Sequence, residues 1–278
     1  MIQDIAPHIY YNQYQPLPPD PDSFLMICCG RNIFLKEAGG EITFLRFQEA
    51  CSLIPDLSHA CTYLFSIDGA RFYLAPEGEY SLPDSFILQP AGFLRTAAPG
   101  YMAFAAITAI QLNSWYKSRR FCGVCGGPLR HHEQERMMYC DSCKTMEYPK
   151  ISPAVIVAVT DGDRLLLTKY ANRAITRYSL IAGFAEIGET IEETIHREVM
   201  EEVGLKVKNI RYYKSQPWSF TDTLLFGFYC QLDGPDKIRL DKNELAVAEW
   251  FDRKNVPGVD HDVSLTQEMM CRFRDGLE

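Results

Sequence analysis

The stretch GFAEIGETIEETIHREVMEEVGL, residues 183–205, decides the fold of this chain. Its second half predicts an amphipathic helix that Gly204 ends, because glycine accepts the left-handed conformation common after a helix. Glu198, Glu201 and Glu202 stand at i, i+3 and i+4, so they share one face of that helix. Their mutual repulsion would destabilise a helix with no cation beside it. The spacing therefore indicates a site for hard divalent cations such as Mg²⁺ or Mn²⁺, which prefer carboxylate oxygens.

A solvated acidic face is the alternative for a bare EVMEE sequence, and the surrounding residues decide against it. The stretch fits the pattern G-x5-E-x7-R-E-U-x-E-E-x-G-U, with U aliphatic, at every fixed position. These positions are Gly183, Glu189, Arg197, Glu198, Val199, Glu201, Glu202, Gly204 and Leu205. The match resembles the box of the Nudix hydrolases, which cut nucleoside diphosphates linked to another group. Within this box we expect Glu189 and Arg197 to pair with each other and brace the loop.

The resemblance implies catalytic and metal-binding roles for the three glutamates of the helix. Glu198, Glu201 and Glu202 would carry the metals, and Glu198 or Glu202 would also orient the attacking water. Two further metal ligands are implied, the backbone carbonyl of Ala182 and the carboxylate of Glu244. Two or three Mg²⁺ or Mn²⁺ ions per site would neutralise a pyrophosphate and activate a water.

Four cysteines upstream of the box form two C-x2-C pairs separated by fourteen residues. They are Cys122, Cys125, Cys140 and Cys143. Paired knuckles at this separation can place four thiolates tetrahedrally around one zinc, which predicts one structural Zn²⁺ per chain. His131 and His132, between the knuckles, are interpreted as solvated loop residues. The other six cysteines lie mostly in apolar runs and are predicted to be buried, reduced thiols.

The ribbon, the segment YPKISP at residues 148–153 and SQPW at residues 215–218 together resemble the NADH pyrophosphatase subfamily of Nudix hydrolases, which also remove NAD caps from RNA. The resemblance covers about residues 121–251. It implies substrate-binding roles for Glu135, Tyr148, Phe184, Gln216, Pro217, Trp218, Ser219, Phe220, Thr221, Asp222, Thr223 and Thr266. Phe184 is expected to stack on the nicotinamide, while Glu135 and Tyr148 would line the same pocket.

The segment SQPWSF, residues 215–220, has two interpretations. Proline lacks a backbone donor, so the segment fits a proline-bent strand edge with a packing tryptophan. The family resemblance makes it a surface that contacts the substrate. Ser219 and Thr221 stand where the family pattern has prolines, which predicts a less rigid loop. Asp222 adds a negative charge near a polyanionic substrate, so these departures concern fine specificity rather than the reaction class.

Local patterns predict several elements along the chain. Residues 65–75 fit a hairpin that turns at Asp-Gly. Residues 101–118 have apolar residues at helical spacing, and residues 153–160 form a continuous apolar strand. An amphipathic helix is expected over about residues 190–203, and a terminal helix over 264–273.

The fold class predicted for the whole chain is α+β / α/β. A β-rich N-terminal domain over residues 1–117 precedes the zinc ribbon, over 118–147, and a Nudix domain over 148–278. The Nudix domain is expected to be an α/β/α sandwich around a mixed sheet. The N-terminal domain is interpreted as a candidate degenerate relative of the catalytic domain that builds a dimer.

Composition narrows the classes of function. The formal net charge of −8 disfavours nonspecific nucleic-acid binding through a broad cationic surface. No apolar run approaches the roughly 20 residues that cross a bilayer, and the first residues lack the layout of a signal peptide. We therefore expect a cytoplasmic protein without a membrane partner, and the family resemblance implies a homodimer.

The function predicted from these features is metal-dependent hydrolysis of the pyrophosphate of NAD(H), giving nicotinamide mononucleotide and AMP, with removal of NAD caps from RNA 5′ ends. One alternative is a Nudix hydrolase for ADP-ribose or another dinucleotide. A second alternative is a non-catalytic, ligand-sensing nucleic-acid binder. The complete glutamate set and the acidic charge balance argue against that second alternative.

Overall fold

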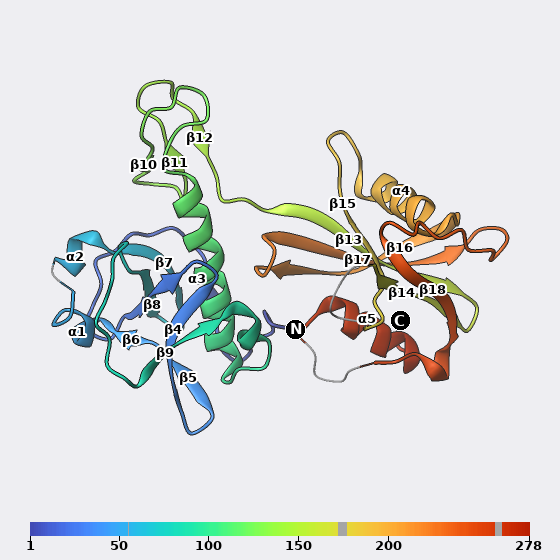
Figure 1. Ribbon diagram of the computed structural model, residues 1–278, viewed down its shortest axis with the longest axis horizontal. Helices are drawn as coiled ribbons and strands as arrows, with labels where there is room; N and C mark the ends of the chain where they lie inside the picture. The colour runs from blue at the N-terminus through green and yellow to red at the C-terminus, as the bar shows by residue number, and fades with distance from the viewer. Residues whose placement is uncertain (55, 172–176, 259–262) are drawn as a thin grey trace. The chain divides into compact units, whose positions relative to one another are not determined.

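The computed structural model describes residues 1–278 except 55, 172–176 and 259–262, and it divides into two compact units (Figure 1). The C-terminal unit comprises Ile151–Glu278 together with Met1, and the N-terminal unit comprises Ile2–Lys150, including the cysteine ribbon. Within the described residues, no helix has the length and apolar character needed to cross a membrane.

A six-stranded mixed sheet forms the centre of the C-terminal unit, in the order β16–β17–β13–β14–β18, with β15 paired to β13. The strands are β13 Ser152–Asp161, β14 Arg164–Tyr170, β15 Ile181–Phe184, β16 Val207–Trp218, β17 Thr223–Leu232 and β18 Leu245–Asp252. β13 runs parallel to β17 and antiparallel to β14 and β15. The predicted mixed sheet is therefore confirmed.

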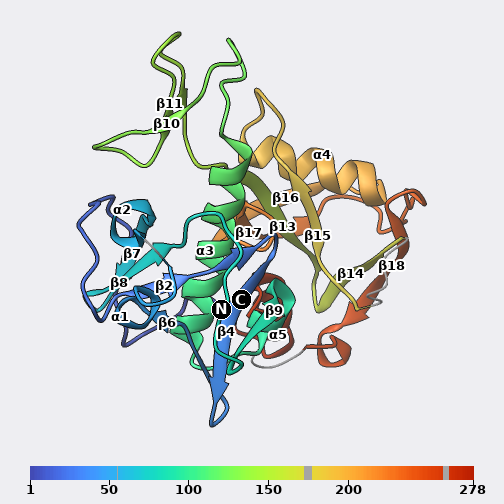
Figure 2. The ribbon, with the colours of Figure 1, turned by 60° about the vertical axis from the view of Figure 1, so that its left-hand side comes forward.

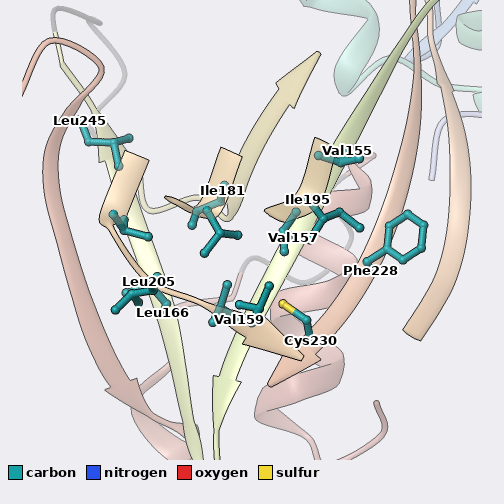
Figure 3. Close-up of a cluster of buried hydrophobic side chains, with 13 residues drawn as sticks. Val155, Val157, Val159, Leu166, Ile181, Ile195, Leu205, Phe228, Cys230 and Leu245 are labelled. Carbon is teal, nitrogen blue, oxygen red and sulfur yellow. The ribbon is translucent and has the colours of Figure 1, made fainter. Parts of the chain in front are cut away.

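Helices cover both faces of this sheet. They are α4 Ile191–Val203 and α5 Leu265–Arg274, and a short 3₁₀ turn, η2 Arg253–Asn255, precedes α5. Val155, Val157 and Val159 of β13 pack into the core on the α4 side (Figure 3). Ile156 and Ala158 point the other way, into the core that α5 closes. A strand buried on both faces needs apolar residues at every position, which explains the unbroken run in β13.

The ends of α4 hold the box helix in place. Thr190 caps its first turn, since the hydroxyl accepts from the backbone N–H of Glu193 at 3.2 Å while the Glu193 carboxylate accepts from the Thr190 N–H at 2.8 Å. Gly204 ends the helix in the left-handed conformation, at φ 68°. Ile195 and Val199 are fully buried against the sheet. With the apolar face of α4 on the sheet, the Glu198 carboxylate lies against Gly183 of β15.

The N-terminal unit is rich in short strands around one long helix. Its elements are β1 Tyr10–Tyr11, β2 Phe24–Met26, β3 Cys28–Cys29, β4 Asn32–Ala38, β5 Glu41–Thr43, β6 Leu45–Arg46, α1 Phe47–Ala50, α2 Leu57–Ala60, β7 Thr62–Ile67, β8 Ala70–Leu74, β9 Phe86–Pro90, η1 Ala91–Arg95 and α3 Gly100–Ser118. The ribbon strands are β10 Arg130–His131, β11 Met138–Tyr139 and β12 Met146–Glu147. The predicted β7–β8 hairpin and the long helix α3 are confirmed, and α3 runs beside β3 and β4 (Figure 2).

The two units share an order of strand pairing. In the C-terminal unit β13 is parallel to β17, β17 is antiparallel to β16, β15 pairs β13, and β14 pairs β18. In the N-terminal unit β2 is parallel to β8, β8 is antiparallel to β7, β6 pairs β2, and β4 pairs β9. In the C-terminal unit α4 lies between β15 and β16 in the chain, and in the N-terminal unit α1 and α2 lie between the corresponding strands β6 and β7. A helix also follows the last strand of each unit, α5 after β18 and α3 after β9.

The cysteines outside the ribbon only partly follow the prediction. Cys230 is buried, at 1% exposure. Cys28, Cys61 and Cys271 are half-buried, while Cys29 and Cys51 are exposed. The prediction of buried thiols is wrong for these last two because Cys29 is the last residue of the short strand β3 and Cys51 follows the end of α1, where the chain leaves the core.

Candidate active site

The carboxylates of α4 differ in burial although they share one helix face. Glu198 is 8% exposed and Glu202 is 2% exposed, whereas Glu201 lies open to solvent. Buried carboxylates are rare unless they are paired or bind a cation. This difference marks Glu198 and Glu202 as the inner pair of the cluster.

Gly183 makes room for the inner pair. A Cβ atom at this position would lie 1.9 Å from the Glu198 carboxyl carbon and 2.0 and 2.2 Å from its two oxygens. Only glycine therefore permits the carboxylate to lie against the backbone of β15. The first glycine of the box is explained by close approach, not by turn geometry.

Arg197 connects the loop to the acidic face. Its Nε donates to Glu189 Oε1 at 2.6 Å, and its Nη1 donates to Glu198 Oε1 at 2.7 Å and to Glu201 Oε2 at 3.0 Å. Its Nη2 donates to the backbone carbonyl of Phe184 at 2.9 Å. The predicted Glu189–Arg197 pair is confirmed. The bonds from Arg197 to two of the box carboxylates were not predicted, because adjacent and one-turn pairs on a helix depend on the rotamer adopted.

Glu202 is the most perturbed acid of the site. Burial raises its pKa from 4.5 to about 8, and repulsion from Glu198, Glu244 and Asp241 adds to that rise. Its Oε2 atom is buried without a hydrogen-bond partner. Asp241 was missed by the sequence reasoning, since only folding brings it beside α4, where its backbone N–H donates to the Glu202 carbonyl at 2.9 Å.

These features test whether the site suits divalent cations. A partnerless buried carboxyl oxygen, a second buried carboxylate against Gly183 and the nearby charge of Glu244 make full ionisation of the cluster unfavourable without a cation. Such an all-oxygen, acidic donor set fits a hard cation. Ala182 lies on β15 beside Gly183, so its backbone belongs to the same neighbourhood.

The segment SQPW is the last part of β16, an edge strand of the sheet. Pro217 stands opposite Leu224, at an edge where its missing N–H costs no ladder bond. The strand-edge interpretation is thus confirmed for the backbone of the segment. Trp218 is half-buried, and its ring centroid lies 4.6 Å from that of Phe220.

Gln216 is fully buried and bonded at both ends of its amide. Its Nε2 donates to the backbone carbonyl of Val263 at 2.8 Å, and its Oε1 accepts from the N–H of Leu265 at 2.7 Å. The side chain therefore fastens β16 to the first residue of α5. Thr266, half-buried in the first turn of α5, lies next to this junction.

The turn between β16 and β17 is compact. The Thr221 N–H donates to the Trp218 carbonyl at 3.1 Å, and the Thr221 and Thr223 hydroxyls lie 2.8 Å apart. Ser219 is 6% exposed. Asp222 has φ 56° and keeps one carboxylate oxygen buried without a partner. These hydrogen bonds close the turn without the prolines of the family pattern, and the lower rigidity of the loop stays a prediction.

The other predicted substrate residues fall into two groups. Phe184, 54% exposed, ends β15 next to Gly183 and presents its ring to solvent. Glu135 and Tyr148 belong to the N-terminal unit, where the Tyr148 hydroxyl donates to Glu135 Oε2 at 2.9 Å. The structure thus brings Glu135 and Tyr148 into contact with each other, and their place in the substrate pocket stays a prediction.

The ribbon brings its four cysteines into a metal-binding arrangement. The sulfur atoms of Cys122, Cys125, Cys140 and Cys143 all lie within 4.8 Å of one another. Gly126, at φ 71°, makes the first tight turn. Four thiolates with no open position suit a structural zinc. His131 is not a loop residue as predicted, because it pairs with Met138 in the ribbon sheet.

The loop, the capped helix α4 and its carboxylates on a two-sided mixed sheet define a Nudix hydrolase. Comparison with known proteins agrees: residues 150–270 match the NUDIX domain model, and residues 117–148 match the NADH pyrophosphatase zinc ribbon domain. The chain is 41% identical over 219 residues to the NAD-capped RNA hydrolase NudC of Chromobacterium violaceum, covering 79% of each chain. It therefore belongs to the NudC family of Nudix hydrolases.

Further relatives match a shorter part of the chain. The NAD-capped RNA hydrolase NudC of Klebsiella pneumoniae is 42% identical over 159 residues, which cover 57% of this chain and 61% of that protein. Among solved structures, a NUDIX hydrolase from Nitrosomonas europaea is 23% identical, with a TM-score of 0.48, and covers 56% of this chain and 90% of its own.

Proposed function

We propose that this protein hydrolyses the pyrophosphate of NAD(H) to nicotinamide mononucleotide and AMP, and removes NAD caps from RNA 5′ ends. The observation that carries the proposal is the buried pair Glu198 and Glu202 on α4, with the partnerless oxygen of Glu202. The zinc ribbon of the NADH pyrophosphatase type and the NAD-capped RNA hydrolase relatives support the substrate.

Each residue of the box has a distinct task in this proposal. Glu198, Glu201, Glu202 and Glu244, with the Ala182 carbonyl, would hold Mg²⁺ or Mn²⁺, two or three ions per site. When bound, these ions supply charge stabilisation for the pyrophosphate and acidify a water. Arg197 holds the carboxylates of Glu198 and Glu201 in place by direct hydrogen bonds.

Substrate recognition is assigned to the rim of the same sheet. The exposed ring of Phe184 is suited to stack on a nicotinamide. The turn after Trp218 and the first turn of α5 at Thr266 supply polar groups. Gln216 would orient this rim through its bonds to Val263 and Leu265 rather than touch the substrate through its buried amide.

The assembly and location are proposed as well. The family resemblance supports a homodimer. All ten cysteines are free of disulfides, which supports a reducing compartment such as the cytoplasm. We also propose that the N-terminal unit is a degenerate copy of the catalytic one. The recurring pairing order supports this, while α1 and α2, which stand in the place of α4, lack the glutamate triad.

The test is a comparison of turnover on NADH, NAD⁺, ADP-ribose and diadenosine compounds, with products separated by chromatography. NADH should give equal amounts of reduced nicotinamide mononucleotide and AMP, and NAD⁺ equal amounts of nicotinamide mononucleotide and AMP. Glu202→Gln should abolish turnover while the circular dichroism spectrum stays unchanged. A large preference for ADP-ribose over NADH would reject the substrate assignment, and full activity of Glu202→Gln would reject the site.

A further inference from the structure

A cavity of about 680 Å³ opens in the N-terminal unit. Small-molecule sites range over about 300–1,000 Å³, so the cavity has the size of a ligand site. Its walls come from α3, from β3 and β4, from the segment that follows β8 and from His131 of the ribbon. None of the lining residues belongs to the glutamate cluster or to the predicted substrate site.

One face of α3 supplies the polar wall. Asn113, Tyr116 and Lys117 line the cavity from α3 at i, i+3 and i+4, and Arg120 lines it from just beyond the end of the helix. These spacings place the three helical side chains on the same side of α3. The apolar wall includes Phe34, and the carboxylates Glu77 and Glu79 also line the cavity.

Asn113 has an unsatisfied hydrogen-bond donor that a ligand in the cavity could pair with. It is 3% exposed, and its Nδ2 atom is buried with no hydrogen-bond partner. A buried donor left unpaired is costly, and native structures rarely keep one without a reason. Among the described residues of α3, Thr108 Oγ1 and Trp115 Nε1 are also buried without partners, but neither residue lines the cavity.

Two cationic side chains at the mouth of the cavity form weak ion pairs that a ligand could replace. Lys117 Nζ lies 3.8 Å and Arg120 Nη1 3.3 Å from the Glu77 carboxylate. All three side chains are largely exposed, so these ion pairs contribute little. A phosphate would offer the same two cations a more highly charged partner and bidentate geometry for the guanidinium.

We propose that this cavity is a second ligand site, for a purine nucleoside monophosphate such as AMP. The base would enter between the apolar wall and Tyr116 and accept a hydrogen bond from Asn113, since an asparagine amide matches the N6/N7 edge of adenine. The phosphate would meet Lys117 and Arg120 at the mouth. The inference goes beyond the proposed hydrolysis because no catalytic carboxylate takes part.

A local thiol gives a readout confined to this site. Cys29 is exposed and lines the cavity, whereas Cys51 is exposed and does not. The full-length protein is treated with iodoacetamide with and without AMP, and each cysteine-containing peptide is quantified by mass spectrometry. With AMP at about ten times its dissociation constant, Cys29 modification should slow about tenfold, while Cys51 modification keeps its rate.

Variants separate the base from the phosphate. Asn113→Leu, of similar volume, removes the unpaired donor and should keep or raise the thermal midpoint, yet AMP should no longer protect Cys29. Arg120→Ala should weaken protection by AMP but leave that by adenosine unchanged. Failure of AMP to protect Cys29, or equal protection in Asn113→Leu, would overturn the proposal. Neither outcome depends on NADH turnover, so the hydrolase assignment is judged separately.

Discussion

At the scale of single residues, the site depends on how closely a carboxylate can approach the backbone. Glu198 occupies the space that a Cβ atom would take at Gly183. The sequence pattern predicted a glycine-led box, but the physical reason appears only in three dimensions, because β15 and α4 are joined by a loop whose path cannot be read from spacing.

Replacing Gly183 with alanine should remove activity without unfolding the protein. The new methyl group must displace the Glu198 carboxylate, and misplacement of a catalytic group by about 1 Å can cost about 100-fold in rate. Steady-state turnover of NADH would measure the loss. Gly92→Ala is a matched control, because a Cβ atom there meets nothing within 4 Å. Near-normal activity of Gly183→Ala would contradict the assigned role of Glu198.

Glu202 should link cation binding to pH. Its pKa in the cation-free protein is about 8, so the carboxyl is mainly protonated at pH 7 and a cation must displace that proton. Because the folded value lies above the unfolded one, its contribution to stability is present below about pH 4.5 and is lost as pH rises through about 8.

Calorimetric titration with Mg²⁺ in buffers of different ionisation enthalpy measures the proton directly. We expect release of about one proton at pH 6.5 and almost none above about pH 9. Glu202→Gln should bind more weakly and lose the pH-dependent release. Proton release that is the same at both pH values would show that Glu202 does not titrate in this range.

At the scale of elements, sequence patterns within one segment predicted the helices and strands that the segment forms. The capped helix α4, the long helix α3 and the apolar strand β13 follow from periodicity and end signals within each segment. The role of Gln216 did not follow, because its partners Val263 and Leu265 stand 47 and 49 residues away. Only the packing of β16 against α5 brings them together.

Gln216→Leu should destabilise the C-terminal unit. The substitution leaves the Val263 carbonyl and the Leu265 N–H without their partner, and each unpaired buried group costs about 1–3 kcal/mol. The midpoint of chemical unfolding should fall, and KM should rise more than kcat falls. Gln48→Leu, at an exposed glutamine, should change neither. Unchanged stability with lost activity would instead favour a direct substrate contact by Gln216.

At the scale of the whole molecule, the two units share one order of strand pairing but contain different sites. The C-terminal unit has the box, and the N-terminal unit has the four-cysteine ribbon and the cavity beside α3. No sequence motif in the first 117 residues predicted the strand-pairing order that the two units share. Strand pairing is set by long-range contacts, and the N-terminal strands are only two to seven residues long.

Loss of zinc should therefore act on one unit. The ribbon strands β10–β12 are short, and four thiolates brought within 4.8 Å repel one another without a cation. Cys140→Ser, at a fully buried ligand, should increase hydrogen exchange over residues 121–147. Strands β13–β18 have their own two-sided core and should keep their protection.

Cys230→Ser, at a buried cysteine outside the ribbon, serves as the control and should leave ribbon exchange unchanged. Equal loss of protection in β13–β18 of the Cys140→Ser variant would show that zinc supports the catalytic unit directly.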